Sequence, residues 1–151
     1  MSIAQTMCTS FKVAILSGEM DFSSDTSQTF KIALYTSDAN LGADTTAYAV
    51  TNEVSGTGYT AGGKTLTLST SATSTETTAY VSFATVSWAD SIITARGALI
   101  YRSSGAGNPA IAVLDFGADK KSDYTSGSGY GSSFDITFPT ANNNTAIIRI
   151  A

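Results

Sequence analysis

Short segments with a strand-like pattern constrain the fold of this chain most strongly. They combine β-branched and aromatic residues, often alternate with polar ones, and are bounded by Gly, Asn, Asp, Ser or Pro. The segments are 29–36, 64–70, 79–88, 95–103, 110–116, 132–138 and 145–150. Strands of this length and spacing are typical of β-sandwiches and jelly rolls. We therefore predict a mainly β, sandwich-like or jelly-roll-like fold over residues 29–150.

The first residues predict a helix instead. Apolar residues recur there at spacings of three and four, as on one face of a helix: Ile3, Met7, Phe11, Ala14 and Ile15. Ser2 is a suitable N-cap, and Gly18 is a suitable terminator. We predict one N-terminal amphipathic helix over residues 2–17. Its polar face lacks the Lys and Arg cluster of a membrane-surface helix.

Length and charge bound the remaining possibilities. A chain of 151 residues without an internal repeat is expected to form one domain, residues 1–151. Twelve acidic and eight scattered basic side chains give a net charge of −4, which argues against direct nucleic-acid binding. No segment approaches the roughly 20 apolar residues that span a bilayer, so we expect no membrane partner and no secretion signal.

Catalytic and metal-binding chemistry has few residues to draw on. The chain has no histidine, which removes the commonest general base and transition-metal ligand. Cys8 is the single cysteine, and in a short helix it is expected to be a small buried hydrophobe. Asp119 and Asp123 resemble part of a calcium loop whose closing Glu is missing. We therefore expect a protein that is not an enzyme, with no catalytic residue, cofactor or metal site.

One motif suggests nucleotide binding. Residues 58–65, GYTAGGKT, match the phosphate-loop pattern G-x-x-x-x-G-K-T. A phosphate loop requires a helix directly after the lysine, whereas the residues after Lys64 alternate as in a strand. We interpret Gly58, Gly62 and Gly63 as a turn before a strand, and we expect no nucleotide role for Lys64.

Two long segments lack the pattern of regular structure. Residues 37–63 form a long connection, with a short helical turn expected near 45–50, and residues 117–131 are rich in Gly and Ser. Loops of this length in a compact domain are usually functional or disordered. Tyrosine offers a large contact area and a hydroxyl for hydrogen bonds. We predict that these segments contact a partner through Tyr48, Tyr59, Tyr124, Tyr130, Lys120 and Lys121.

The order of short motifs along nearly the whole chain carries a resemblance. Gly18-Glu19 is followed by KIAL (31–34), YTAGGKTL (59–66), ALIY (98–101), IAVLDF (111–116) and IRI (148–150). This succession resembles a family of small structural proteins of tailed bacteriophages, and similar small β-sandwich proteins act as capsid decoration, or cement, proteins. The glycine turn at 58–65 falls on one of the family's elements.

The resemblance implies a function in the virion. It suggests a decoration protein that binds and stabilises the outer surface of the icosahedral head after assembly in the host cytoplasm. Its partners would be the major capsid protein and copies of itself, plausibly in a homotrimer. A tail, neck or baseplate component is the alternative within the same particle. A glycan-binding virion sandwich, with Tyr and Trp exposed in a groove, is a further alternative.

Overall fold

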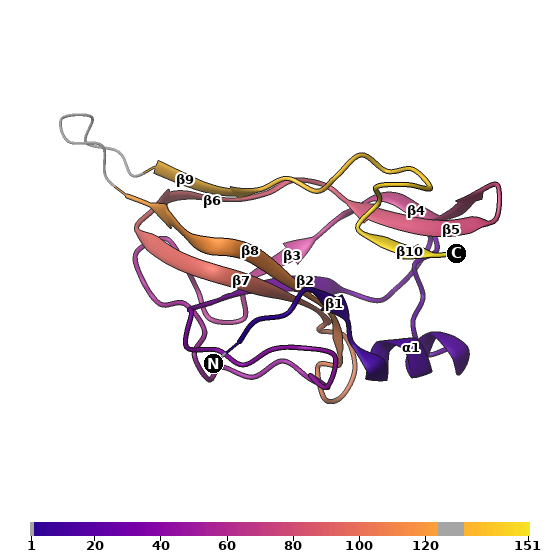
Figure 1. Cartoon of the computed structure of the whole chain (residues 1–151), viewed down its shortest axis with the longest axis horizontal. Helices are drawn as coiled ribbons and strands as arrows, with labels where there is room; N and C mark the ends of the chain where they lie inside the picture. Colours follow the sequence, from indigo (N-terminus) through magenta and orange to yellow (C-terminus); the bar gives the residue numbers. More distant parts are fainter. Residues whose placement is uncertain (1, 124–131) are drawn as a thin grey trace.

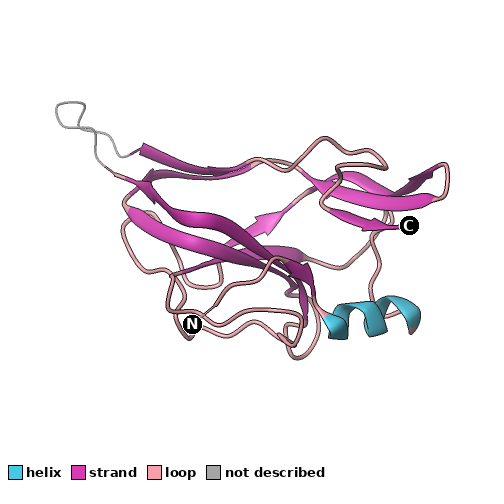
Figure 2. Ribbon diagram, viewed as in Figure 1, coloured by secondary structure: helices cyan, strands magenta, loops and turns pink. Residues whose placement is uncertain are grey.

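The computed structural model describes residues 2–123 and 132–151. Within them the chain is mainly β, with one short helix near the N-terminus (Figures 1 and 2). This confirms the predicted sandwich-like fold. The elements in chain order are β1 Thr6–Met7, α1 Thr9–Leu16, β2 Phe30–Tyr35, β3 Lys64–Leu66, β4 Leu68–Thr75, β5 Thr78–Phe83, β6 Val86–Ser91, β7 Ile93–Arg102, β8 Ala110–Ser122, β9 Ser132–Ile136 and β10 Ile148–Ile150.

The described strands form antiparallel sheets that lie in layers. A five-stranded sheet has the order β1-β8-β7-β2-β3, a second sheet has the order β10-β5-β4, and β6 pairs with β9 in a two-stranded ribbon. In Figure 1 the ribbon lies above β7 and β8, and the β10-β5-β4 sheet lies at the end of the molecule that carries α1. Much of the 37–63 segment lies below the five-stranded sheet in Figure 1, but its residues 57–59 approach the ribbon: Thr57 forms a bridge with Ile92, and Tyr59 stacks on Trp88 of β6.

Because other elements cover both faces of the five-stranded sheet, its central strands do not alternate strictly between apolar and polar residues. In β2, every residue except the half-buried Lys31 is buried. On the ribbon, Trp88 is 1% exposed and packs edge-on against Phe134. In the 37–63 segment, Tyr48 stacks on Tyr101 of β7, with ring centroids 4.7 Å apart. A strand covered on both faces has no solvent side, so its polar positions disappear.

The helix is shorter than predicted, and the prediction of residues 2–17 was wrong at its start. Cys8, not Ser2, is the N-cap residue. The predicted terminator is confirmed: Gly18 has φ 76°, and Gly18 N and Glu19 N donate to the carbonyls of Ile15 and Ala14.

The residues before the helix are extended. Met7 pairs with Ala112 across β1 and β8, and Ile3 forms a bridge with Leu41. Ile3 also reaches Gly97 of β7, where a Cβ atom would lie 2.9 Å from the Ile3 side chain. Ile3 and Met7 therefore pack against the sheet. The stability gained from this packing outweighs their weak preference for a helix.

A chain of phenylalanine rings joins α1 to two sheets. Neighbouring ring centroids are 4.7 to 6.1 Å apart. Such aromatic pairs add stability beyond their buried area. The rings belong, in order of contact, to Phe11, Phe22, Phe30, Phe83 and Phe138.

Other local predictions also need correction. Segment 79–88 contains two strands of different sheets, β5 and β6, and segment 64–70 contains β3 and the start of β4. No helical turn forms at 45–50, where Ala47 instead forms a bridge with Pro109. β8 continues to Ser122, so the predicted irregular segment 117–131 begins as a strand. Long β8 extends because β7 offers a partner along its length.

Candidate functional site

The residues predicted to contact a partner lie in different places. Tyr48 and Tyr59 are half-buried in the 37–63 segment. Lys120 and Lys121 are exposed on β8. Tyr124 and Tyr130 lie outside the described residues. The structure therefore does not bring the four described residues together into one site.

The two tyrosines bind a glutamate of their own segment. The Tyr48 hydroxyl donates to Glu53 Oε2 at 2.6 Å, and the Tyr59 hydroxyl donates to Glu53 Oε1 at 2.7 Å. The Gly62 backbone N–H donates to the same Oε1 at 2.7 Å. The Tyr59 oxygen also accepts from the Leu34 backbone N–H at 2.8 Å. Both hydroxyl protons are thus used within the segment, and the Leu34 N–H fastens Tyr59 to β2.

Two more tyrosines complete this group, which we call the Glu53 cluster. The Tyr35 hydroxyl donates to the Ala49 carbonyl at 2.6 Å, and the Tyr101 hydroxyl donates to the Gly62 carbonyl at 2.7 Å. Burial raises the pKa of Tyr35, Tyr48 and Tyr59 well above the usual value near 10, and the Glu53 carboxylate raises them further. The phenols therefore remain neutral donors at physiological pH.

The structure agrees with the interpretation of Gly58, Gly62 and Gly63 as a turn before a strand. Gly58, Gly62 and Gly63 all have positive φ, and Lys64 begins strand β3. The anion at the Gly62 N–H is the Glu53 carboxylate of the same chain. Lys64 Nζ donates to the Ser87 carbonyl at 2.5 Å and lies 5.9 Å from the centre of the Trp88 ring. The lysine thus ties β3 to the ribbon.

A groove runs between β8 and β9. The two strands are joined at one end, where Ser132 N donates to the Asp123 carbonyl, and they then diverge into different sheets. The groove measures about 630 Å³, within the range of ligand-binding clefts. Its lining residues are Gln5, Leu114, Asp115, Phe116, Lys120, Lys121, Ser133, Phe134, Asp135, Ile136, Thr137, Phe138, Pro139 and Ile147. Two predicted contact residues, Lys120 and Lys121, therefore line it.

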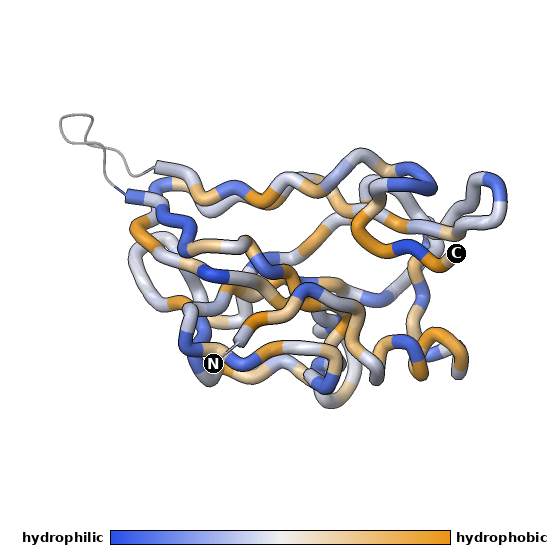
Figure 3. Tube along the Cα trace, viewed as in Figure 1, coloured by the Kyte–Doolittle hydropathy of each residue, from blue (hydrophilic) through white to orange (hydrophobic). Residues whose placement is uncertain are grey.

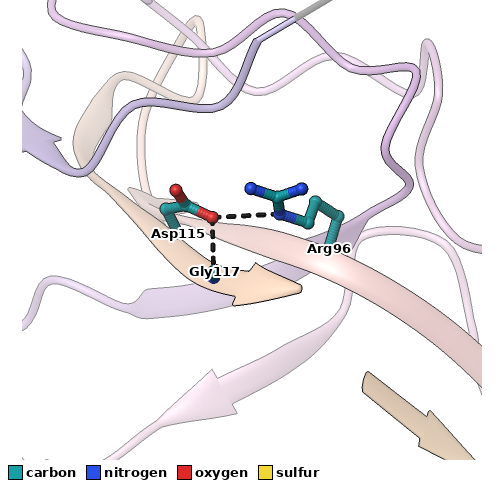
Figure 4. Close-up of polar contacts among 3 residues, drawn as sticks. All are labelled: Arg96, Asp115 and Gly117. Atoms are coloured by element: carbon teal, nitrogen blue, oxygen red, sulfur yellow. Dashed lines mark hydrogen bonds and ion pairs between the residues drawn. The ribbon is translucent and has the colours of Figure 1, made fainter. Parts of the chain in front are cut away.

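A bulge in β8 shapes one wall of this groove. Gly97 pairs with Asp115 and Ala95 pairs with Lys120, so residues 116–119 stand opposite Arg96 alone. Asp115 Oδ1 accepts from the Gly117 backbone N–H at 2.9 Å and from Arg96 Nε at 3.1 Å (Figure 4). These two donors hold the pKa of Asp115 below its usual range, so the carboxylate stays ionised at neutral pH.

The charged groups of the groove differ in their partners. Asp115 is paired with Arg96, and Asp135 accepts a hydrogen bond from Ser133, which lowers the pKa of Asp135. Within residues 2–123 and 132–151, neither Lys120 nor Lys121 forms an ion pair. Among the described residues, the groove therefore presents two lysines outside any ion pair, together with the ionised Asp135.

Sequence reasoning missed most of this groove. Phe116, Phe134 and Phe138 lie in segments predicted as strands, and Asp115 was noted as part of the IAVLDF motif. One signal was present: Gly117 follows a strand directly, as glycine does at many bulges. The position of β9 opposite β8 depends on sheet topology, which a local pattern does not contain.

A second surface lies where α1 meets β10. Leu16 is 89% exposed, Val13 is 61% exposed and Ile150 is 48% exposed. Figure 3 shows hydrophobic stretches on α1 and on the C-terminal strand at this end of the molecule. Beside them is an apolar groove of about 310 Å³, in which Asp21 is the single charged lining residue. We call this surface the apolar end; its groove is lined by Ile15, Met20, Phe22, Ala72, Ala79, Tyr80, Val81, Ile148 and Ile150 with Asp21 and Ser23.

Two features are missing from the part of the chain that the structure describes, a metal-ligand cluster and a membrane-spanning helix. No group of three His, Cys, Asp or Glu side chains there could hold a metal ion. The described helix is too short to cross a membrane.

No family model, curated protein or solved structure matches the chain.

Proposed function

We propose that this chain is a capsid decoration, or cement, protein that binds the outer surface of the icosahedral head of a tailed bacteriophage. Two observations agree with this role: the sandwich-like fold and the succession of motifs that resembles phage structural proteins. The protein performs no chemistry in this role. It stabilises the assembled shell by mass action, because it binds assembled subunits and not free ones.

The apolar end is the observation that carries the proposal. Of the four large apolar side chains that are exposed among the described residues, three, Leu16, Val13 and Ile150, lie on α1 and β10, and the fourth is Val50. A contiguous exposed apolar surface marks an interaction site in a soluble protein. A protein that is functional only when packed among neighbours accounts for this surface better than an enzyme does.

A second copy of the chain is the occupant that fits the apolar end. The groove there has one charged lining residue, Asp21, so two copies can approach without strong repulsion. Closed rings are the usual form of homo-oligomers, and a trimer would match a three-fold position of an icosahedral shell. Ring closure would also combine several weak shell contacts into one avid attachment.

Binding to heads tests the proposal directly. Purified protein is added to DNA-filled heads that lack it, and its occupancy is measured by electron cryo-microscopy. We expect density on the outer surface and a higher temperature of DNA release, in line with stabilisation by mass action. Binding to tails, necks or baseplates but never to heads would replace this function with the tail-component alternative. Binding to a host-glycan array but to no virion part would favour the glycan-binding alternative.

Self-association at the apolar end is tested separately. Leu16→Glu adds a charge to this end at a position that is 89% exposed, so folding should be unaffected while oligomers dissociate. Val50→Glu makes the same change at a position that is 65% exposed in the 37–63 segment and serves as the matched control. Equal oligomeric mass for the two variants in analytical ultracentrifugation would refute the self-association.

A further inference from the structure

The groove between β8 and β9 follows the edge of a strand. Residues 133–136 are consecutive in β9 and all of them line it, as do residues 137–139, which follow the strand. Successive side chains of a strand point to opposite faces, so a groove on one face would meet only every second residue. A groove lined by consecutive residues therefore runs along the edge of β9, where main-chain groups are presented.

Both strands beside the groove have a free edge. Among the described residues β9 pairs only with β6, so its other edge has no strand partner. β1 pairs with β8 at Ala112 and Val113, and Cys8 N donates to the Ile111 carbonyl; among the described residues no strand pairs with 114–122 on that side. Unpaired N–H and C=O groups along such an edge are a template for another extended chain.

The groove also offers a side-chain surface that suits a strand. Apolar residues from both sheets line it, including Leu114, Phe116, Phe134 and Ile147. Lys120 and Lys121 add two positive charges, Arg96 balances the charge of Asp115, and Asp135 remains ionised with a hydrogen bond from Ser133, so one positive charge is in excess. A strand with apolar side chains on one face and acidic ones on the other would match both features.

We infer that the β6–β9 ribbon accepts a third strand along the free edge of β9: an extended segment of the coat protein with alternating apolar and acidic residues. The incoming backbone pairs with β9, its apolar side chains enter the groove, and its acidic side chains, all on the other face, approach whichever of the consecutive Lys120 and Lys121 lies on that face of β8. Strand addition of this kind takes affinity from main-chain hydrogen bonds and specificity from side-chain pockets. The identity of the strand's source rests on the proposed decoration function.

A protected edge is the competing explanation. Lysines and bulges are also the devices by which proteins prevent unwanted strand pairing, and β8 has both. The two explanations differ in their prediction, because a protected edge binds no strand at all.

Binding of a designed peptide distinguishes an edge that accepts a strand from a protected edge. The probe is a capped heptapeptide of alternating Val and Glu, and the matched control peptide has Lys in place of Glu. We expect the Val–Glu peptide to shift and protect backbone amides of β9 in NMR spectra of the labelled protein. The Lys120→Glu/Lys121→Glu variant should bind it about tenfold more weakly and should prefer the Val–Lys peptide. Lys12→Glu, a charge reversal on α1, should bind the Val–Glu peptide as the unmodified protein does.

Other results would overturn the inference. Absence of binding at millimolar Val–Glu peptide, or amide changes confined to residues away from β9, would establish the protected edge instead. Peptides with reversed charge that bind equally well to the unmodified protein would refute the role of the two lysines.

Head binding distinguishes this inference from the proposed function. If the Lys120→Glu/Lys121→Glu variant decorates heads as fully as the unmodified protein, strand addition fails and the decoration function stands. If the Val–Glu peptide binds β9 but the protein never occupies heads, decoration fails and the groove stands as a strand-binding site. Loss of head occupancy in the variant supports both.

Discussion

The 37–63 segment and the β8 side of the β8–β9 groove share a sequence character but differ in structure. Both contain glycines with positive φ, and both contribute residues that sequence reasoning assigned to partner contacts. In 37–63 the polar groups find partners inside the chain, where Glu53 accepts from Tyr48, Tyr59 and Gly62. On the groove side, Lys120 and Lys121 have no such partner among the described residues.

This difference shows what separates a framework loop from a binding surface. Composition gives both segments the means to form hydrogen bonds and contacts. Only the surrounding structure decides whether those groups are satisfied internally. A loop packed on a sheet must satisfy its buried polar groups, since an unpaired buried donor is costly. A strand edge on the surface is satisfied by water and remains available.

Two glycines offer the largest contrast between the regions. At Gly63 an added Cβ would lie 1.8 Å from the Ile32 carbonyl oxygen at φ 69°, whereas at Gly117 it would meet no atom within 4 Å at φ 76°. We expect Gly63→Ala to lower the free energy of unfolding by about 3–5 kcal/mol through strain and overlap. Gly117→Ala creates no overlap, so we expect it to lower the free energy of unfolding only through the strain of its positive φ, by about 1–2 kcal/mol. Urea unfolding of the two variants measures both values, and equal losses would contradict the contrast.

Removal of the Glu53 carboxylate should have the next largest effect. Glu53→Ala leaves the Tyr48, Tyr59 and Gly62 donors without their acceptor, and we expect a loss of about 2–4 kcal/mol in urea unfolding. Glu19→Ala is the control, because Glu19 is exposed and only its backbone carbonyl is used as an acceptor. A loss below about 0.5 kcal/mol for Glu53→Ala would show that the cluster does not hold the segment.

Alkaline pH should weaken the 37–63 side selectively. The folded pKa values of Tyr35, Tyr48 and Tyr59 are raised above 10, so the folded state keeps phenol protons that the unfolded chain releases. Their contribution to stability is complete below pH 10 and falls as the pH rises beyond it. For each phenol that the folded state keeps protonated up to pH 11, we expect about 1.4 kcal/mol to be lost between pH 9 and 11.

Unfolding at fixed pH values measures this loss, and the Tyr48→Phe/Tyr59→Phe variant supplies the comparison. Since it lacks two of the phenols, its stability should depend less on pH in this range. A profile that stays flat to pH 11 in the unmodified protein would contradict internal satisfaction of these hydroxyls.

The groove side should give the smallest effect on stability. Lys120→Ser/Lys121→Ser changes two exposed side chains that form no ion pair within the described residues, and we expect a change within about 0.5 kcal/mol. Differential scanning calorimetry checks this value. A loss comparable with that of Glu53→Ala would place these lysines in the framework and remove the distinction between the two regions.

The sequence was most informative about strands. Alternation and β-branched residues located β2, β7 and β9 well, because these features reflect burial on a sheet. The start of the helix was wrong because Ile3 and Met7 fit a helical period as well as an edge-strand environment. Segment 79–88 concealed a switch between sheets at Ala84 and Thr85, where no glycine or proline marks a break.

The residues of the candidate site were harder to predict from the sequence than the strands were. Lys120 and Lys121 were selected for their charge, and the structure places them at a groove whose opposite wall comes from β9. Tyr48 and Tyr59 were selected for their contact potential, yet their partner Glu53 was not singled out. Which loop packs on which sheet depends on pairings between distant residues, and single-sequence patterns report only local preference.

The pairing of β1 with β8 has a consequence for how the protein folds. Thr6 meets Val113, and Val86 meets Ile136, so these sheets close only after widely separated parts of the chain find one another. The entropy of closing such loops must be overcome before the contacts are gained, which places folding in the millisecond-to-second range typical of β-sandwiches. During that interval the aromatic strands are exposed, so refolding yield should decline as protein concentration increases.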